Sequence, residues 1–398
     1  MHIRIIRGQN QIGGNIIEVG TESTKIILDV GIELDEKIPD VPLVNGLFQG
    51  EANYNAVLIS HYHGDHIGLI NNILPNISIF MGEKAYNVYK TSMEYLNNDT
   101  VEISNFFRSE KEFYIGDINI KPILCDHSAF DSYMISLFSK NKKILYTGDF
   151  RASGRKSFYS LLKRLDKVDV LITEGTTLSR ENFYSYTEKD LEKNAVETIQ
   201  NNNYPVFVLM PSTNIDRIVT FYKVAIKTNR IFLQDTYMAS ITTIAGNNIP
   251  NPKDFKNVRV FLTMPSNKNY EILKSYRDKK IGRKGIAKEN FIMCVRSSMK
   301  SYLEKLSNEI SFNGGILFYS MWKGYLENED MSNFIKFMEN KGVETVYLHT
   351  SGHADVNAID NLIKRTEPKY IIPIHTENSK WFEKYKNCEI IYDNQFNF

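Results

Sequence analysis

The segment from Ser60 to His66, with the sequence Ser-His-Tyr-His-Gly-Asp-His, constrains this chain more than any other. It follows the apolar run 56–59, which is typical of a buried β-strand, and it holds three of the eight histidines. Ionisable side chains this close together are costly to bury unless something pairs with them. Neutral imidazole and carboxylate are the ligands that zinc and similar divalent ions prefer. The segment therefore predicts a metal site at a strand end, and this position after an apolar run disfavours the alternative of a surface histidine cluster.

Other apolar runs also end in an acid or a histidine. The runs 118–124, 144–147 and 370–374 lead to His127, Asp149 and His375. We expect one metal ion to be held by His61, His63 and His127, a second by Asp65, His66 and His375, and Asp149 to bridge them. A hydroxide shared by two such ions is a strong nucleophile at neutral pH, which indicates a hydrolase.

Length and composition set the broad class of protein. A chain of 398 residues predicts two domains or one domain with a large insertion. Lys and Arg number 48 against 47 Asp and Glu, so the net charge of +1 gives no evidence for a polyanionic partner, although it leaves room for a local basic groove. Three widely spaced cysteines predict no disulfide framework. With no signal-peptide pattern at the N-terminus and no apolar stretch of membrane-spanning length, we expect a cytoplasmic protein and no membrane partner.

The pattern of expected secondary structure changes near residue 185. Before that point short strands alternate with loops. After it, the expected helix 188–202, strand 205–210 and helix 214–228 alternate in the manner of a parallel α/β sheet. From about residue 345 the first pattern returns: apolar strands end near His353 and His375.

These motifs resemble those of the metallo-β-lactamase fold. The resemblance rests on His-x-His-x-Asp-His at 61–66, on His127, on Asp149 within Thr-Gly-Asp-Phe, and on Asp29 within Leu-Asp-Val-Gly. It covers residues 1 to about 175 and resumes near 345. It implies an α/β protein (an α+β sandwich) with αββα layers, a di-metal site at one edge, and Asp29 in a supporting role.

The long insertion resembles that of the β-CASP nucleases, and most closely that of the ribonuclease J group. The segments that carry this likeness are Leu171–Thr177, Ser351–Asp355, Pro373–Glu377 and Ser212–Arg217. It implies a metallo-β-lactamase domain at 1–178 and 345–398 and a parallel α/β β-CASP domain at 179–344. Two departures stand out: Thr376 replaces a glycine, and the segment Trp322–Tyr325 replaces an expected Pro-Gly-Asn loop.

The resemblance implies roles for further residues. His353 would bind or protonate the scissile phosphate, and Glu174 would orient His353 or His66, so Asp65, Glu174 and His353 are the expected catalytic residues. Ser351 with the backbone of Gly352 and Ala354 would cradle a phosphate. Asn214 and Arg217 are expected to contact RNA.

The leading hypothesis is therefore a di-metal ribonuclease, with zinc as the favoured ion and manganese as the alternative. Its expected partner is single-stranded RNA or, as a second option, DNA, and the resemblance allows a homodimer. The alternative function is a metallo-hydrolase of a small ester, lactone or thioester. A third hypothesis is a catalytically silent nucleic-acid-binding or scaffold subunit, which we rank last because every expected ligand is present.

Overall fold

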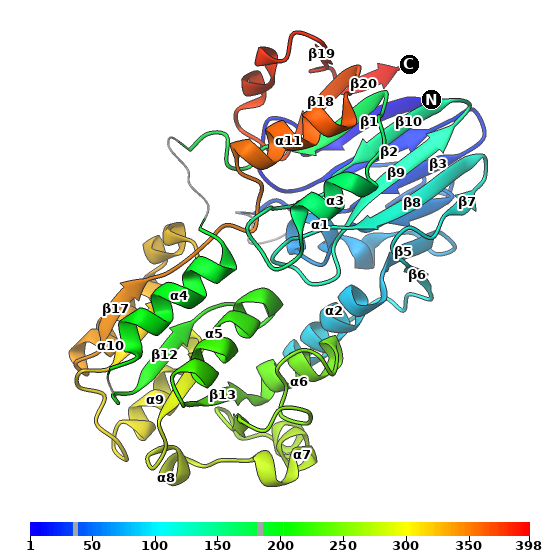
Figure 1. Cartoon of the computed structure of the whole chain (residues 1–398). Coiled ribbons are helices and arrows are strands. Elements are labelled where there is room, and N and C mark those ends of the chain that lie inside the picture. Colours follow the sequence, from blue (N-terminus) through cyan, green and yellow to red (C-terminus); the bar gives the residue numbers. More distant parts are fainter. Residues whose placement is uncertain (35–38, 181–185, 202) are drawn as a thin grey trace. The chain divides into compact units, whose positions relative to one another are not determined.

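The computed structural model describes residues 1–34, 39–180, 186–201 and 203–398, and these form two compact units (Figure 1). The first unit comprises Met1–Ser185 and Gly352–Phe398, and the second comprises Tyr186–Ser351. These bounds lie a few residues beyond the predicted domain bounds of 178 and 345. The assignment of the units to named domains stays a prediction.

The described strands of the first unit form two mixed sheets. The first sheet runs in the order β20 (Gln395–Asn397), β1 (His2–Arg7), β2 (Ile16–Gly20), β3 (Lys25–Leu28), β4 (Ala56–Leu58), β5 (Ser78–Gly82) and β6 (Asn105–Phe107). The second runs in the order β19 (Glu389–Ile390), β18 (Tyr370–Ile374), β11 (Val170–Glu174), β10 (Lys142–Tyr146), β9 (Tyr133–Ser139), β8 (Ile118–Leu124) and β7 (Phe113–Ile115).

The two sheets share one hydrophobic core. Ile17 and Ile26 of the first sheet pack in the same buried cluster as Ile135 and Ile172 of the second. Helices α3 (Phe158–Arg164) and α11 (Val356–Thr366) share a separate cluster with the other face of the second sheet, and α2 (Glu83–Leu96) contacts β5. Helices therefore lie outside both sheets, and the predicted αββα sandwich is confirmed.

Parallel pairing brings several strand ends to one edge of each sheet. In the second sheet β11 lies between β10 and β18 and is parallel to both, with Glu174 opposite Ile374. In the first sheet β3 is parallel to β4, with Leu28 opposite Leu58. Because side chains that follow parallel strands emerge at the same edge, this pairing collects the polar residues that the sequence places after each apolar run.

Helix α1 (Gly64–Ile67) begins directly after His63. It is a single turn, and it already contains Asp65 and His66. The carbonyl oxygen of His63 accepts hydrogen bonds from the backbone N–H groups of both His66 and Ile67. This turn directs the carboxylate and the imidazole to the same place without a longer helix.

The second unit is built on an all-parallel sheet, as predicted. Its described strands run in the order β14 (Val258–Phe261), β13 (Ile231–Asp235), β15 (Phe291–Val295), β12 (Val206–Leu209), β16 (Ile316–Tyr319) and β17 (Glu344–Tyr347). Its helices are α4 (Glu188–Ile199), α5 (Ile215–Lys227), α6 (Thr236–Ala245), α7 (Asn267–Ser275), α8 (Arg283–Ile286), α9 (Lys300–Leu306) and α10 (Glu329–Asn340).

Both faces of this sheet are covered. Phe207 and Leu317 pack with residues of α9 and α10, whereas their neighbour Phe318 meets Phe221 of α5 with 5.5 Å between ring centroids. Successive side chains of a strand point to opposite faces, so α5 lies across the sheet from α9 and α10. None of the helices in the described part of the chain combines the length and the apolar character needed to cross a bilayer.

Candidate metal centre

Two groups of histidines and aspartates gather in the first unit. One group comprises His61, His63 and His127, and the other comprises Asp65, His66, Asp149 and His375. Within each group every residue offers a ligand atom that lies within 4.8 Å of the others. The structure thus brings all seven residues together, with Asp149 in the second group and its Oδ2 3.9 Å from Nε2 of His61 in the first. Their role as metal ligands remains a proposal.

Asp29 determines which nitrogen of His66 faces the centre. Its buried carboxylate accepts hydrogen bonds from the backbone N–H and the hydroxyl of Ser60, at 2.6 and 2.7 Å, and from the hydroxyl of Tyr146. Oδ2 of Asp29 also lies 2.7 Å from Nδ1 of His66. When Nδ1 donates its proton to this carboxylate, Nε2 of His66 keeps its lone pair for a ligand. This contact supports the role predicted for Asp29.

In two other histidines Nδ1 likewise contacts a supporting oxygen, which leaves Nε2 to face the centre. Nδ1 of His127 lies 2.5 Å from the carbonyl oxygen of Gly352, and Nδ1 of His375 lies 2.8 Å from the hydroxyl oxygen of Thr176. Nε2 of His127 lies 3.2 Å from Nδ1 of His63, so these two nitrogens face a common point. Groups behind the rings therefore orient the inward-facing nitrogens, as is usual for metal-binding histidines.

The centre contains buried polar atoms that the described residues do not satisfy. Nε2 of His61 and both carboxylate oxygens of Asp149 have no hydrogen-bond partner among them. Oδ2 of Asp149 lies 3.2 Å from Nε2 of His66 and 3.8 Å from Nε2 of His375. Burying a carboxylate without a hydrogen bond costs folding free energy. A cation bound between the carboxylate and the imidazole nitrogens would offset this cost. Nitrogen and oxygen donors of this kind fit zinc or manganese.

The pKa values of the histidines follow from burial and neighbouring charge. Burial is the largest cause of the lowered pKa of His61 and His127, which falls well below the usual value, and of His63, which falls to about 4. Burial acts on His66 too, but Asp149, Asp29 and Asp65 outweigh it and raise the pKa of His66. The three imidazoles of the first group are thus neutral at pH 7, and neutral imidazole is the form that binds a metal ion.

Glu174 orients His353 rather than His66, the other partner considered from the sequence. Its buried carboxylate lies 3.1 Å from Nδ1 of His353 and accepts hydrogen bonds from the hydroxyl of Thr176 at 2.7 Å and the backbone N–H of Phe150 at 2.9 Å. Burial favours the neutral ring of His353, but the charges of Glu174 and Asp149 outweigh it and raise its pKa to about 9. The side chain of His353 is 23% exposed, whereas those of His61, His66 and His375 are 0 to 1% exposed, so His353 is open to a substrate.

The predicted phosphate cradle is partly occupied by the protein itself. The N–H of Ala354 donates a 3.4 Å hydrogen bond to Glu174, and the carbonyl of Ala354 accepts one from Thr177 at 2.6 Å. The carbonyl of Gly352 faces His127, and Ser351 is buried at the end of the second unit. Ala354 therefore serves the Glu174 carboxylate in this structure.

Arg217 and Asn214, which were expected to contact RNA, both make hydrogen bonds within the second unit. The side chain of Arg217 is fully buried, and its guanidinium makes an ion pair with the equally buried Glu188, with 3.1 Å between Nη2 and Oε1. It also donates to the backbone of Ser320 at 3.1 Å. Asn214 caps helix α5 by accepting a hydrogen bond from the N–H of Arg217 at 3.1 Å. Within the motif Ser212–Arg217, burial makes the guanidinium of Arg217 inaccessible to a phosphate.

Several supporting residues were missed at the level of sequence. Thr176 lies between Glu174 and His375, and Ser60 and Tyr146 converge on Asp29. Each is an ordinary strand-end residue, so no pattern distinguished it. Gly31 carried a clearer signal, because it lies two residues after Asp29, at the end of the Leu-Asp-Val-Gly motif. A Cβ atom at Gly31 would come within 1.7 Å of the carbonyl oxygen of Asp65, so only glycine allows this close approach.

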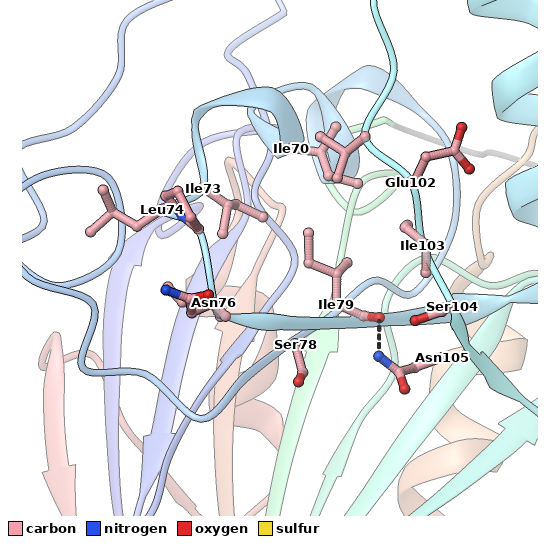
Figure 2. Close-up of a pocket in the computed structure, with 13 residues that line it drawn as sticks. Ile70, Ile73, Leu74, Asn76, Ser78, Ile79, Glu102, Ile103, Ser104 and Asn105 are labelled. Carbon is pink, nitrogen blue, oxygen red and sulfur yellow. Dashed lines mark hydrogen bonds between the residues drawn. The ribbon is translucent and has the colours of Figure 1, made fainter.

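A surface pocket of about 350 Å³ lies elsewhere in the first unit, where β5 meets the segment before β6 (Figure 2). Ile70, Ile79 and Ile103 line it, and the side chain of Asn105 donates to the carbonyl of Ile79 at 3.4 Å (Figure 2). None of the residues around it belongs to the two groups of histidines and aspartates. This pocket is therefore separate from the candidate metal centre.

Comparison with known families gives two matches. Residues 37–210 match the family described as "Beta-lactamase superfamily domain", and residues 335–385 match "Zn-dependent metallo-hydrolase RNA specificity domain". The first match contains His61 to His66, His127, Asp149 and Glu174. The second contains His353 and His375.

Known proteins resemble the chain over most of its length. Ribonuclease J of Mycoplasma genitalium is 24% identical over 93% of this chain and 67% of the relative, and ribonuclease J of Helicobacter pylori (strain 26695) is 20% identical over 93% and 55%. The chain thus spans between about half and two thirds of the length of these relatives. A crystal structure of a protein of unknown function from Enterococcus faecalis V583 has the same fold, with a TM-score of 0.81, 20% identity and 99% coverage of both chains.

Proposed function

We propose that this chain, whose residues 37–210 match the β-lactamase superfamily domain and whose residues 335–385 match the RNA specificity domain, is a metal-dependent ribonuclease that hydrolyses phosphodiester bonds of single-stranded RNA. One observation carries the proposal. Asp149, with neither carboxylate oxygen hydrogen-bonded among the described residues, lies against His66 at 3.2 Å and against the partly exposed His353 at 3.4 Å. A phosphate-binding imidazole and a candidate cation site thus share one carboxylate.

The residues present fit two divalent ions, for which we propose zinc. His61, His63 and His127 would hold one ion, and Asp65, His66 and His375 the other, with Asp149 between them. Ions bound there would supply charge stabilisation at a phosphoryl oxygen and would make water more acidic. The description of the matching RNA specificity domain as zinc-dependent supports this choice.

The chain's own residues would position the substrate. Glu174 accepts from Nδ1 of His353, and its charge outweighs burial and raises the pKa of His353 to about 9. The ring is therefore protonated on both nitrogens at pH 7, and Nε2 can donate a hydrogen bond to a phosphate oxygen. Thr176 ties Glu174 to His375, so the support for His353 and the support for the second group are one hydrogen-bonded unit. A shift of Glu174 would therefore disturb both the orientation of His353 and that of His375.

The test is cleavage of end-labelled single-stranded RNAs that carry a 5′-monophosphate or a 5′-triphosphate, with DNA of the same sequence in parallel. We expect the full chain with zinc or manganese to cleave the RNA and the combined Asp65→Ala and His66→Ala variant to lose this activity. Mononucleotide products would indicate an exonuclease, and discrete fragments an endonuclease.

Two outcomes would overturn the proposal. The first is a metal-loaded protein that leaves every RNA intact, and the second is a double variant as active as the wild type. Hydrolysis of small esters or thioesters without RNA cleavage, retained in His353→Ala, would favour the alternative metallo-hydrolase.

A further inference from the structure

Exposed aromatic side chains gather on the second unit, where the segment Trp322–Tyr325 replaces the Pro-Gly-Asn loop expected from the family resemblance. Trp322 is 49% exposed, Tyr325 is 50% exposed and Tyr347 is 43% exposed. The first two lie at the 3₁₀ helix η4 (Lys323–Glu327) that follows β16, and Tyr347 ends the neighbouring edge strand β17. We call these three residues, with Lys323, the aromatic patch. Large exposed rings that cluster in this way mark an interaction surface.

The indole of Trp322 is held in place by its own loop. The position of a Cβ atom on Gly324 would be 2.2 Å from two carbons of the indole ring, so the ring lies against this glycine. The carbonyl of Trp322 accepts hydrogen bonds from the hydroxyl of Tyr319 at 3.0 Å and from the N–H of Tyr325 at 3.2 Å. The rings of Trp322 and Tyr325 meet edge to face, at 5.6 Å and 84°. A ring fixed before binding loses little conformational entropy when a planar ligand stacks on it.

The patch carries one well-placed cation. The ammonium of Lys323 lies 4.4 Å from the centroid of the Tyr347 ring, which itself stacks on Tyr319 at 5.9 Å and 24°. The residues that follow include the exposed acids Glu327, Glu329 and Asp330. A patch with one lysine and adjacent acids cannot track a phosphate backbone, but it can stack a base and meet a single phosphate.

We propose that the aromatic patch is a base-stacking subsite for the single-stranded RNA whose cleavage is proposed above, an inference that rests on that function. Six positions separate Tyr347 from His353, and six residues of extended chain span at most about 22 Å in any arrangement of the two units. Residues 335–385, which match the RNA specificity domain, contain Tyr347. An RNA strand that places a phosphate at His353 is therefore within a few nucleotides of the patch.

The two tryptophans of the chain allow a direct test. In the full-length Trp381→Phe variant, Trp322 is the remaining tryptophan, and a base stacked on it should quench its fluorescence. We expect saturable quenching by a single-stranded oligoribonucleotide and none by an abasic oligomer of the same length. No quenching at RNA concentrations that saturate binding, measured by filter retention, would overturn the proposal. This measurement needs no cleavage, so the subsite and the proposed enzymatic function can fail separately.

Substitution provides the quantitative test. Trp322→Ala should weaken RNA binding by about 5- to 150-fold, the range for loss of one stacked base, while Trp322→Phe should recover part of the loss. The KM for RNA should rise with little change in kcat, and hydrolysis of bis(p-nitrophenyl) phosphate, which offers no base to stack, should be unchanged. Tyr159→Ala is the matched control, because Tyr159 is 67% exposed and also carries a lysine, Lys163, 4.4 Å from its ring centroid.

The same patch would serve a protein partner if its rings were buried against a second copy of the chain. That alternative predicts a concentration-dependent dimer, seen by light scattering, which Trp322→Ala dissociates while RNA affinity stays the same. This result would overturn the proposal. A fall in RNA affinity of equal size in Tyr159→Ala would do so as well, because the effect would then not be specific to the patch.

Discussion

Both compact units bury charged side chains near the carboxyl ends of their parallel strands, yet the charges are compensated differently. In the second unit Arg217 and Glu188 are both fully buried and pair with each other at 3.1 Å. In the first unit Asp149 is buried among imidazoles, and neither of its oxygens has a hydrogen-bond partner among the described residues. A buried pair is complete without a ligand, whereas the carboxylate oxygens of Asp149, with no hydrogen-bond partner among the described residues, remain available to a cation. Buried charge alone therefore does not identify a functional site; the geometry of its partners does.

The substitution Asp149→Asn tests this contrast most strongly, because it removes the charge that we propose lies between the two bound ions while keeping the side-chain shape. We expect RNA cleavage to fall by at least about 10³-fold, since bound metal ions supply several kcal/mol of transition-state stabilisation. The metal content, measured by plasma mass spectrometry, should fall with it. Glu188→Gln is the control and should keep its metal. Full metal content in the Asp149→Asn variant would contradict our account of the centre.

The reverse experiment is Arg217→Met, which leaves the Glu188 carboxylate buried without its partner. We expect the free energy of unfolding, measured with urea, to fall by about 3–5 kcal/mol, the usual cost of breaking a buried ion pair on one side. Adding Glu188→Gln to the same chain should recover part of this loss. The metal bound per folded molecule should stay at the wild-type value. A loss of metal instead would show that the two regions are coupled.

The smallest expected effect is that of Asp29→Asn, which weakens the support behind His66. Support groups of this kind are worth about 10- to 100-fold in metal affinity, so zinc should bind more weakly by that factor in a competition titration with a chromophoric chelator. Asp117→Asn is a matched control, because Asp117 also accepts from hydroxyl groups, including Thr24 at 2.7 Å, but lies outside the centre. Equal zinc affinities in the two variants would contradict the orienting role of Asp29.

The sequence predicted the strands and their polar ends well because both depend on local patterns. An apolar run followed by an acid or histidine fixes the residue at the strand end, and parallel pairing of β10, β11 and β18 then brings Asp149, Glu174 and His375 to the same edge. The single turn of α1 was harder to predict, since its length depends on the hydrogen bonds that its ends accept.

The role of Arg217 could not be predicted from its motif. Whether a guanidinium binds a phosphate or a carboxylate depends on its burial. The ion-pair partner of Arg217 is Glu188, which belongs to another helix, α4. Thr176 and Tyr146 were missed for a similar reason. Their hydroxyls matter because of the atoms they reach, His375 and Asp29, which are distant in the chain.

The pairing of β11 with β18 has a consequence for the synthesis of this protein. Thr176 and His375, which share a hydrogen bond in the finished centre, are 199 residues apart, and the whole second unit is translated between them. At about 5–20 residues per second, this interval lasts roughly 10–40 s on the ribosome. During that time the second unit can fold, while the second sheet of the first unit still lacks β18. A nascent chain therefore cannot bring Asp65, His66, Asp149 and His375 together until His375 has emerged, so the candidate metal centre is completed only after the second unit has been synthesised.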